Sequence, residues 1–126
     1  MNLKTIGDMF ELAKNVSKHS DFRVKMGAVL VKKGSRPLSV GFNVKKFHPK
    51  GYPNKNQHAE WRAVQTCSSG VEGATIFVYR EHGKTGLPML AKPCENCEKF
   101  LKESGIKTVF YTTSEFPYFE KMTLTK

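Results

Sequence analysis

Apolar and polar positions along the chain predict helices and strands in succession. Between Ile6 and Val16 the apolar residues recur at helical spacing, which predicts an amphipathic helix over residues 3 to 18. Apolar runs bounded by turn residues predict strands over residues 26–33, 38–43, 74–80 and 108–113. The first two strands are separated by a Gly-Ser-Arg-Pro turn and should form a hairpin.

Helical patterns separate the later strands. One helix is expected from about His58 to Cys67, and a second from Glu95 to Glu103. This order predicts an α/β fold in which a mixed sheet carries helices on both faces. Near the C-terminus, residues 114–121 are expected to open a last short helix, and residues 122–126 to form a frayed end or a short edge strand.

Composition narrows the class of protein further. A length of 126 residues suits a single domain spanning residues 1–126. No apolar run approaches the roughly 18 residues needed to cross a membrane, and the N-terminal sequence does not read as a secretion signal, so a cytoplasmic location is expected. The odd number of cysteines, three, argues against a disulfide framework. A net charge of +10 favours anionic partners such as nucleotides or nucleic acid, although a Lys-rich surface would give the same count.

Two short motifs supply metal-binding chemistry. His58 and Glu60 stand at the beginning of one predicted helix, and Cys94 and Cys97 lie within the Pro-Cys-Glu-Asn-Cys stretch that opens another. If both helices follow parallel strands, both N-termini lie at the same edge of the sheet. His58, Cys94 and Cys97 could then hold one Zn²⁺ ion, and three protein ligands leave a fourth position for water. Glu60 is expected to act as the proton shuttle rather than as a ligand.

Two alternatives account for part of this pattern. A Cys-x-x-Cys pair is also typical of thioredoxin-like redox proteins, and a structural zinc could recruit Cys67, His48 or His82 as a fourth ligand. Neither alternative gives the His-Ala-Glu motif a role. The combination of His-x-Glu with Pro-Cys-x-x-Cys is the signature of zinc-dependent base deaminases.

The chain resembles the cytidine and deoxycytidylate deaminase superfamily, and within it the deoxycytidylate deaminase-like proteins of bacteriophages. The resemblance is carried by Met-Gly-Ala-Val-Leu-Val, Gly-Phe-Asn, His-Ala-Glu, Lys-Pro-Cys-Glu-Asn-Cys and Ser-Gly-Ile-Lys-Thr-Val-Phe-Tyr-Thr. It implies a three-layer α/β/α sandwich with a mixed sheet of four to five strands and a homo-oligomeric assembly. It also implies a cytoplasmic location, that of the host if the protein is phage-encoded, and a substrate sugar contacted by Asn43.

The implied reaction is hydrolytic deamination of cytosine on a nucleotide, with dCMP converted to dUMP. Zinc hydroxide would attack C4 of a ring that rests against His58 and the Ala59 backbone, while Glu60 moves the protons. The loop of residues 43–57 holds four lysines and no acid. Substrate-side candidates at this edge are Lys46, His48 and Arg80, with ordinary solvated roles as the alternative.

Rival functions remain open at this stage. The same chemistry could act on cytosine or adenine in single-stranded DNA or RNA, because both bases are deaminated with the same ligand set. A non-enzymatic nucleic-acid-binding domain with a structural zinc is the remaining possibility. Trp61 is expected in the core, and Cys67 is expected to be a buried, inert cysteine.

Overall fold

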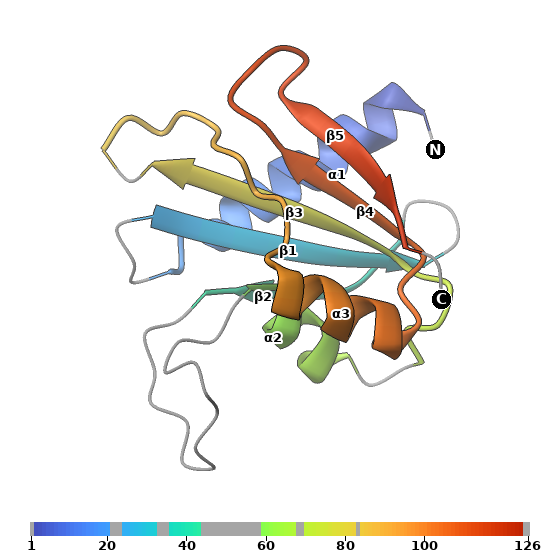
Figure 1. The fold of residues 1–126 in the computed structure, drawn as a ribbon. Coiled ribbons are helices and arrows are strands. Elements are labelled where there is room, and N and C mark those ends of the chain that lie inside the picture. Colours follow the sequence, from blue (N-terminus) through green and yellow to red (C-terminus); the bar gives the residue numbers. More distant parts are fainter. Residues whose placement is uncertain are drawn as a thin grey trace.

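A five-stranded mixed sheet forms the middle layer of the molecule (Figure 1). The computed structural model describes residues 2–20, 24–32, 36–43, 59–67, 70–82 and 84–124. The helices are α1 (Leu3–Ser17), α2 (Ala59–Thr66) and α3 (Glu95–Ser104), and the strands are β1 (Val24–Lys32), β2 (Arg36–Phe42), β3 (Thr75–His82), β4 (Thr108–Thr112) and β5 (Phe119–Thr123).

The strands are ordered β2-β1-β3-β4-β5 across the sheet. β1 pairs antiparallel with both β2 and β3, β3 pairs parallel with β4, and β4 pairs antiparallel with β5. Consequently β2, β3 and β4 all run in the same direction. The carboxyl ends of these three strands therefore meet at one edge of the sheet.

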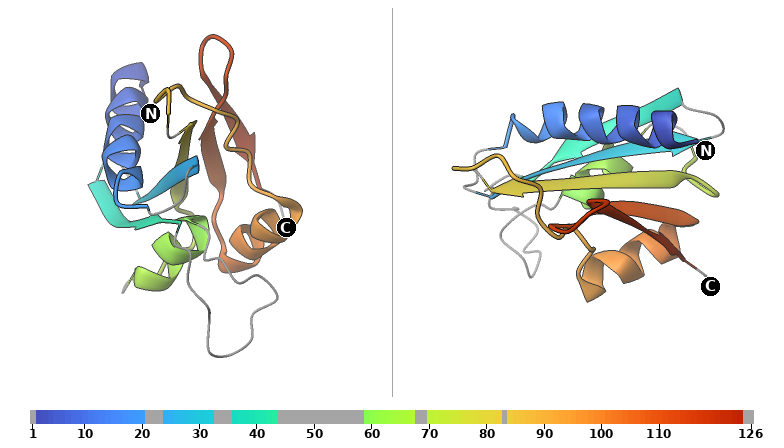
Figure 2. Two further views of the ribbon diagram at one scale, coloured as in Figure 1. Left: turned by 90° about the vertical axis from the view of Figure 1, so that its left-hand side faces the viewer. Right: turned by 90° about the horizontal axis from the view of Figure 1, so that it is seen from above.

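Helices cover both faces of the sheet, with α1 on one side and α2 and α3 together on the other (Figure 2). The sequence-based prediction of an α/β sandwich is thus confirmed. Each face has its own apolar cluster: the α1 side is built around Phe77, Phe110 and Val29, and the α2/α3 side around Leu30, Ile76 and Leu101. Alternate residues of β3 divide between the two clusters, as a strand covered on both faces requires.

Glycines allow the helices to lie directly on the strands. A Cβ atom built on Gly27 of β1 would overlap the carbonyl oxygen of Ala13 in α1. A Cβ atom on Gly41 of β2 would lie 2.5 Å from the backbone nitrogen of Ala63 and 2.6 Å from the carbonyl oxygen of Ala59, both in α2. Two helices therefore pack against backbone on opposite faces of the sheet.

The prediction of a last helix over residues 114–121 is wrong. Those residues form the turn between β4 and β5 and the first part of β5, which pairs with β4 from Thr108↔Thr123 to Thr112↔Phe119. Phe119 packs on the α1 side against Phe110, with ring centroids 6.4 Å apart. The fifth strand therefore begins three residues earlier than the 122–126 segment expected to provide it.

None of the helices in the described part of the chain is both long enough and apolar enough to cross a membrane.

Candidate active site

The N-termini of α2 and α3 lie at the edge of the sheet where β2, β3 and β4 end. α2 connects β2 to β3, and α3 connects β3 to β4, so both helices run back from that edge. Parallel crossovers of this kind place helix N-termini and loop residues together, where ligands bind in open α/β sheets. The arrangement expected from the sequence is therefore present.

α2 is positioned by its close contact with β2. Ala59 and Ala63 are fully buried against Gly41, and the hydroxyl of Ser39 donates a hydrogen bond to the carbonyl oxygen of Ala63 at 2.5 Å. Small residues on both sides let the first turn of α2 lie on the strand backbone. This contact fixes the position of Glu60, which is the second residue of the helix.

Glu60 is a buried carboxylate on the α3 side of α2. Its side chain is 1% exposed, which is rare for an ionisable residue outside a functional site. The charge of Glu60 contributes to raising the pKa of the Cys97 thiol, so the two side chains are neighbours across the helix pair. The structure thus brings together a carboxylate and a thiol that the sequence separates by 37 residues.

Cys94 and Cys97 occupy the first turn of α3 in different ways. Cys94 is the N-cap residue: its backbone is extended, and its Sγ accepts a hydrogen bond from the Cys97 backbone N–H at 3.5 Å. Cys94 is exposed, whereas Cys97 is buried. The helix begins at Glu95, as expected, and Pro93 immediately precedes its N-cap.

Burial dominates the protonation of Cys97. Desolvation raises the pKa of this thiol well above its ordinary value, and the nearby Glu60 and Cys94 raise it further. Burial therefore favours the neutral thiol over the thiolate. A cation bound beside the thiol would reverse this balance, because metal ligation deprotonates cysteine.

These donors suit zinc. Two cysteine sulfurs from one helix turn provide the soft ligands that Zn²⁺ accepts, and the three cysteines, all in the described part of the chain, form no disulfide. No cluster of three potential metal ligands occurs among the described residues. The third expected ligand, His58, lies outside the described residues, immediately before Ala59.

Asn43 follows the last residue of β2 and is 8% exposed. Its Oδ1 accepts a hydrogen bond from the Met26 N–H at 2.9 Å, and its Nδ2 donates to the Val24 carbonyl oxygen at 3.1 Å. The amide therefore ties the end of β2 to the beginning of β1. One Nδ2 hydrogen and one Oδ1 lone pair are left over from these two bonds.

Arg80 lies near the carboxyl end of β3. Because side chains alternate along a strand, Arg80 is on the same face as Val78, which is the face that α2 and α3 cover. Its Nη1 donates to the Leu90 carbonyl oxygen at 3.2 Å, in the segment that leads to Cys94. Lys46 and His48, the other substrate-side candidates, lie outside the described residues.

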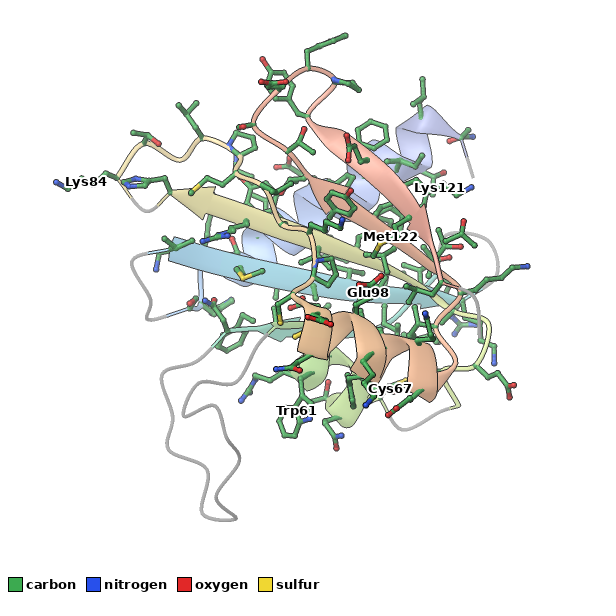
Figure 3. All side chains as sticks on the ribbon, in the orientation of Figure 1. Trp61, Cys67, Lys84, Glu98, Lys121 and Met122 are labelled. Atoms are coloured by element: carbon green, nitrogen blue, oxygen red, sulfur yellow. The ribbon has the colours of Figure 1, made fainter. Side chains whose placement is uncertain are left out.

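Two other residues depart from their expected environment. Trp61, expected in the core, is only half-buried and extends from α2 on the side away from the sheet (Figure 3). Cys67, expected to be buried, is half-buried at the end of α2 and packs against the edge of the apolar cluster. Neither belongs to the group formed by Glu60, Cys94 and Cys97.

Comparison with known proteins identifies the class. Residues 3–113 match the family model of the cytidine and deoxycytidylate deaminase zinc-binding region. The chain belongs to this family of hydrolytic deaminases, as the motifs indicated. Family membership implies zinc, and the two sulfurs at the beginning of α3 fit that implication.

Solved structures share the fold. dCMP deaminase from the cyanophage S-TIM5 in apo form is 24% identical, with 90% of this chain and 86% of that chain covered at a TM-score of 0.67. The same cyanophage enzyme in complex with dCMP and dUMP is 23% identical, with 90% of this chain and 84% of that chain covered at a TM-score of 0.68. Cytidine deaminase from Burkholderia pseudomallei is 21% identical, with 98% of this chain and 94% of that chain covered at a TM-score of 0.67. No curated protein sequence matches the chain.

Proposed function

We propose that this protein deaminates the cytosine of dCMP by hydrolysis, giving dUMP and ammonia. The observation that carries the proposal is the fully buried carboxylate of Glu60 beside the thiol of Cys97, at the N-termini of two adjacent helices. A buried carboxylate next to a cation site is the arrangement that moves protons during attack of water on a base.

His58, Cys94 and Cys97 would hold one Zn²⁺ ion, which supplies a water of lowered pKa. Two thiolates and one neutral imidazole would balance the charge of the ion, and a set of three protein ligands would leave a place for that water. Cys94, as the N-cap of α3, presents its sulfur outside the helix, whereas Cys97 approaches from the buried side.

Glu60 would take a proton from the attacking water and deliver it to N3 of the cytosine ring. In a second transfer, Glu60 would take the proton of the new C4 hydroxyl and deliver it to the departing amine. The C4–O bond forms and the C4–N bond breaks, so ammonia leaves and the carbonyl of uracil remains. Burial suits this role, because exclusion of water keeps the proton on the reacting groups.

Substrate recognition is assigned to the rim of the same edge. The ring would rest against His58 and the Ala59 backbone, and the leftover donor of the Asn43 amide would contact the sugar. Arg80, Lys46 and His48 would face the 5′-phosphate side. The guanidinium of Arg80 has five N–H donors, of which Leu90 takes one.

Support for a nucleotide comes from charge and from a similar protein. A net charge of +10 favours an anionic substrate. The cyanophage deaminase of the same fold is described in complex with dCMP and dUMP.

The same charge favours a second candidate, a deaminase acting on cytosine or adenine in single-stranded DNA or RNA. Contacts to many phosphates release many counterions, so the affinity for a nucleic acid would fall steeply as the salt concentration rises. A mononucleotide has one phosphate group, so its affinity would depend less on salt.

One assay separates these substrates. Ammonia release is measured side by side from dCMP, deoxycytidine, dAMP and a cytosine-containing oligonucleotide. The proposal requires turnover of dCMP in excess of all the others. Activity on the oligonucleotide alone would transfer the proposal to nucleic acid, and activity on dAMP alone would assign adenine as the base.

We further propose that the enzyme works as a homo-oligomer. Exposed apolar side chains gather where the segment after β3 meets the β4–β5 turn: Leu90 is 52% exposed and Phe116 86% exposed, and both line one pocket of about 280 Å³. Light scattering coupled to gel filtration tests this proposal, and a mass of one chain would refute it.

A further inference from the structure

The segment from Met89 to Ala91, which leads into Cys94, is fastened to the sheet by four hydrogen bonds. It has no regular secondary structure of its own. Its residues bond to Arg80 on β3 and to Thr112 on β4, just beyond the end of the parallel ladder between those strands. We call it the 89–91 segment.

Thr112 is the centre of this attachment. It is the last residue of β4 and is 4% exposed. Its hydroxyl donates to the Met89 carbonyl oxygen at 2.8 Å and accepts a hydrogen bond from the Arg80 N–H at 3.2 Å. Its carbonyl oxygen accepts from the Ala91 N–H at 2.9 Å. One side chain thus joins two strands and the segment.

Arg80 supplies the remaining bonds. Its carbonyl oxygen accepts from the Met89 N–H at 2.8 Å, and its Nη1 donates to the Leu90 carbonyl oxygen at 3.2 Å. Each of the three residues of the segment is therefore bonded to the edge of the sheet, Met89 through both backbone groups, Leu90 through its carbonyl and Ala91 through its N–H. Four hydrogen bonds to two neighbouring strands hold the backbone of the segment in one position.

Only Lys92 and Pro93 separate Ala91 from Cys94. Three chain steps span at most about 11 Å, and the ring of Pro93 fixes one of the backbone dihedral angles. Ala91 is buried in the same apolar cluster as Leu101 of α3. A shift of the segment would therefore be transmitted directly to Cys94, an exposed residue whose sulfur accepts a hydrogen bond from the Cys97 N–H in the first turn of α3.

We infer that Thr112 is a positioning residue for the metal centre: its hydroxyl fixes the 89–91 segment and thereby the sulfur of Cys94 relative to Cys97 and Glu60. The inference rests on the proposed function, since it requires a metal held by the two cysteines. Hydrogen-bonded groups behind metal ligands commonly alter metal affinity by 10- to 100-fold.

The test compares three variants of the same strand. Thr112→Val keeps the shape and removes the hydroxyl, Thr112→Ser keeps the hydroxyl, and Thr108→Val makes the same replacement at the far end of β4. Zinc affinity is measured by competition with a chromophoric chelator. Cobalt(II) loaded in place of zinc reports the sulfur ligands through their charge-transfer absorption.

Thr112→Val should bind zinc about tenfold or more weakly than the original chain and give a weaker cobalt–thiolate band. Thr112→Ser should restore most of both signals, and Thr108→Val should change neither. Equal zinc affinity and equal cobalt spectra in folded Thr112→Val and the original chain would overturn the inference. If Thr112→Val does not fold, hydrogen exchange in the original chain decides: unprotected amides of Met89 and Ala91 would overturn the inference, and amides as protected as those of β4 would support it.

Zinc binding by the original chain distinguishes a failure of the proposed function from a failure of the role of Thr112. An original chain that binds no zinc overturns both the proposed function and the role of Thr112. An original chain that binds one zinc ion, together with a Thr112→Val variant that binds it equally well, overturns the role of Thr112 alone.

Discussion

The side-chain amide of Asn43 accepts the Met26 backbone N–H at 2.9 Å, so the residue expected to contact the substrate also joins β2 to β1. The same amide donates to the Val24 carbonyl oxygen at 3.1 Å. These two bonds leave one donor and one acceptor of the amide for a ligand. Structural and binding roles can therefore share one side chain.

Replacing Asn43 by Ala should reduce both stability and substrate binding. Loss of two buried hydrogen bonds should lower the free energy of unfolding by about 1 to 3 kcal/mol. Loss of one substrate contact should raise KM for dCMP by about five- to tenfold. Urea unfolding and steady-state kinetics measure the two effects separately. A destabilised variant with an unchanged KM would leave Asn43 a structural role only.

Replacing Gly41 by Ala should displace α2 and with it Glu60. The new methyl group would lie 2.5 Å from the Ala63 nitrogen and 2.6 Å from the Ala59 carbonyl oxygen, so the helix has to move. Overpacking of this kind costs about 1 to 3 kcal/mol, and kcat should fall because the carboxylate moves with the helix. Thermal unfolding and kcat at saturating substrate check both parts.

Two further glycines provide controls. Gly27→Ala also creates a clash, but with α1 on the opposite face, so it should lower stability and leave kcat of the folded protein unchanged. Gly7 lies in α1 with open space around it, so Gly7→Ala should stabilise the protein by about 0.5 to 1 kcal/mol. An equal loss of kcat in Gly41→Ala and Gly27→Ala would contradict the proposed link between Gly41 and the active site.

Sequence patterns predicted the local elements well and the long-range contacts less well. The helix expected over residues 95–103 is present as α3, and the buried strands were expected from their apolar runs. Such signals lie within a few neighbouring residues, so they can be found in a single sequence. Placement of α2 and α3 at one sheet edge followed from the order of the elements.

The edge strand was expected three residues too late in the chain, for a physical reason. The sequence of β5, Phe-Glu-Lys-Met-Thr, has little β-branched character, and its first three residues were assigned to the expected last helix. The strand exists because its backbone pairs with β4 and Phe119 packs against Phe110, contacts that involve distant parts of the chain.

The roles of Gly41 and Thr112 were also hidden from the sequence. Gly41 belongs to a motif that had been singled out, but only the structure reveals α2 lying against its backbone. Thr112 is an ordinary strand residue by pattern. Its importance comes from hydrogen bonds to Arg80 and to Met89, 32 and 23 residues away along the chain.

Tyr111 should make the protein less stable in alkali. Burial and the hydrogen bond to Glu120, 2.7 Å between the hydroxyl oxygen and Oε2, raise the pKa of Tyr111 to about 12. An unfolded tyrosine ionises near pH 10, so the unfolded chain loses this proton first. The contribution is fully present below about pH 10 and is lost as the pH rises towards 12.

The free energy of unfolding is measured for the original chain and for Tyr111→Phe between about pH 9 and about pH 12, a range that includes the pKa of tyrosine in the unfolded chain and in the folded protein. As the pH rises, the free energy of unfolding of the original chain should fall more steeply than that of Tyr111→Phe. The difference between the two slopes is at most about 1.4 kcal/mol per pH unit, because one proton is involved. Glu120→Gln, which retains an acceptor without the charge, should fall between them. Identical slopes for the original chain and Tyr111→Phe would show that this hydroxyl does not titrate as the structure indicates.

Glu60→Gln tests the chemistry most directly, because glutamine keeps the shape of the side chain and cannot carry the proton. The variant should bind one zinc ion per chain with the affinity of the original chain, since Glu60 is not a proposed ligand. Its kcat should fall by a factor of about 10² to 10⁴, the usual contribution of general acid–base catalysis. Metal analysis and ammonia release from dCMP give the two numbers. Cys97→Ser is the matched comparison, because it should lose zinc and activity together. A Glu60→Gln variant that lost its zinc would make the carboxylate a ligand, and one that retained full activity would require a different proton carrier at the N-terminus of α2.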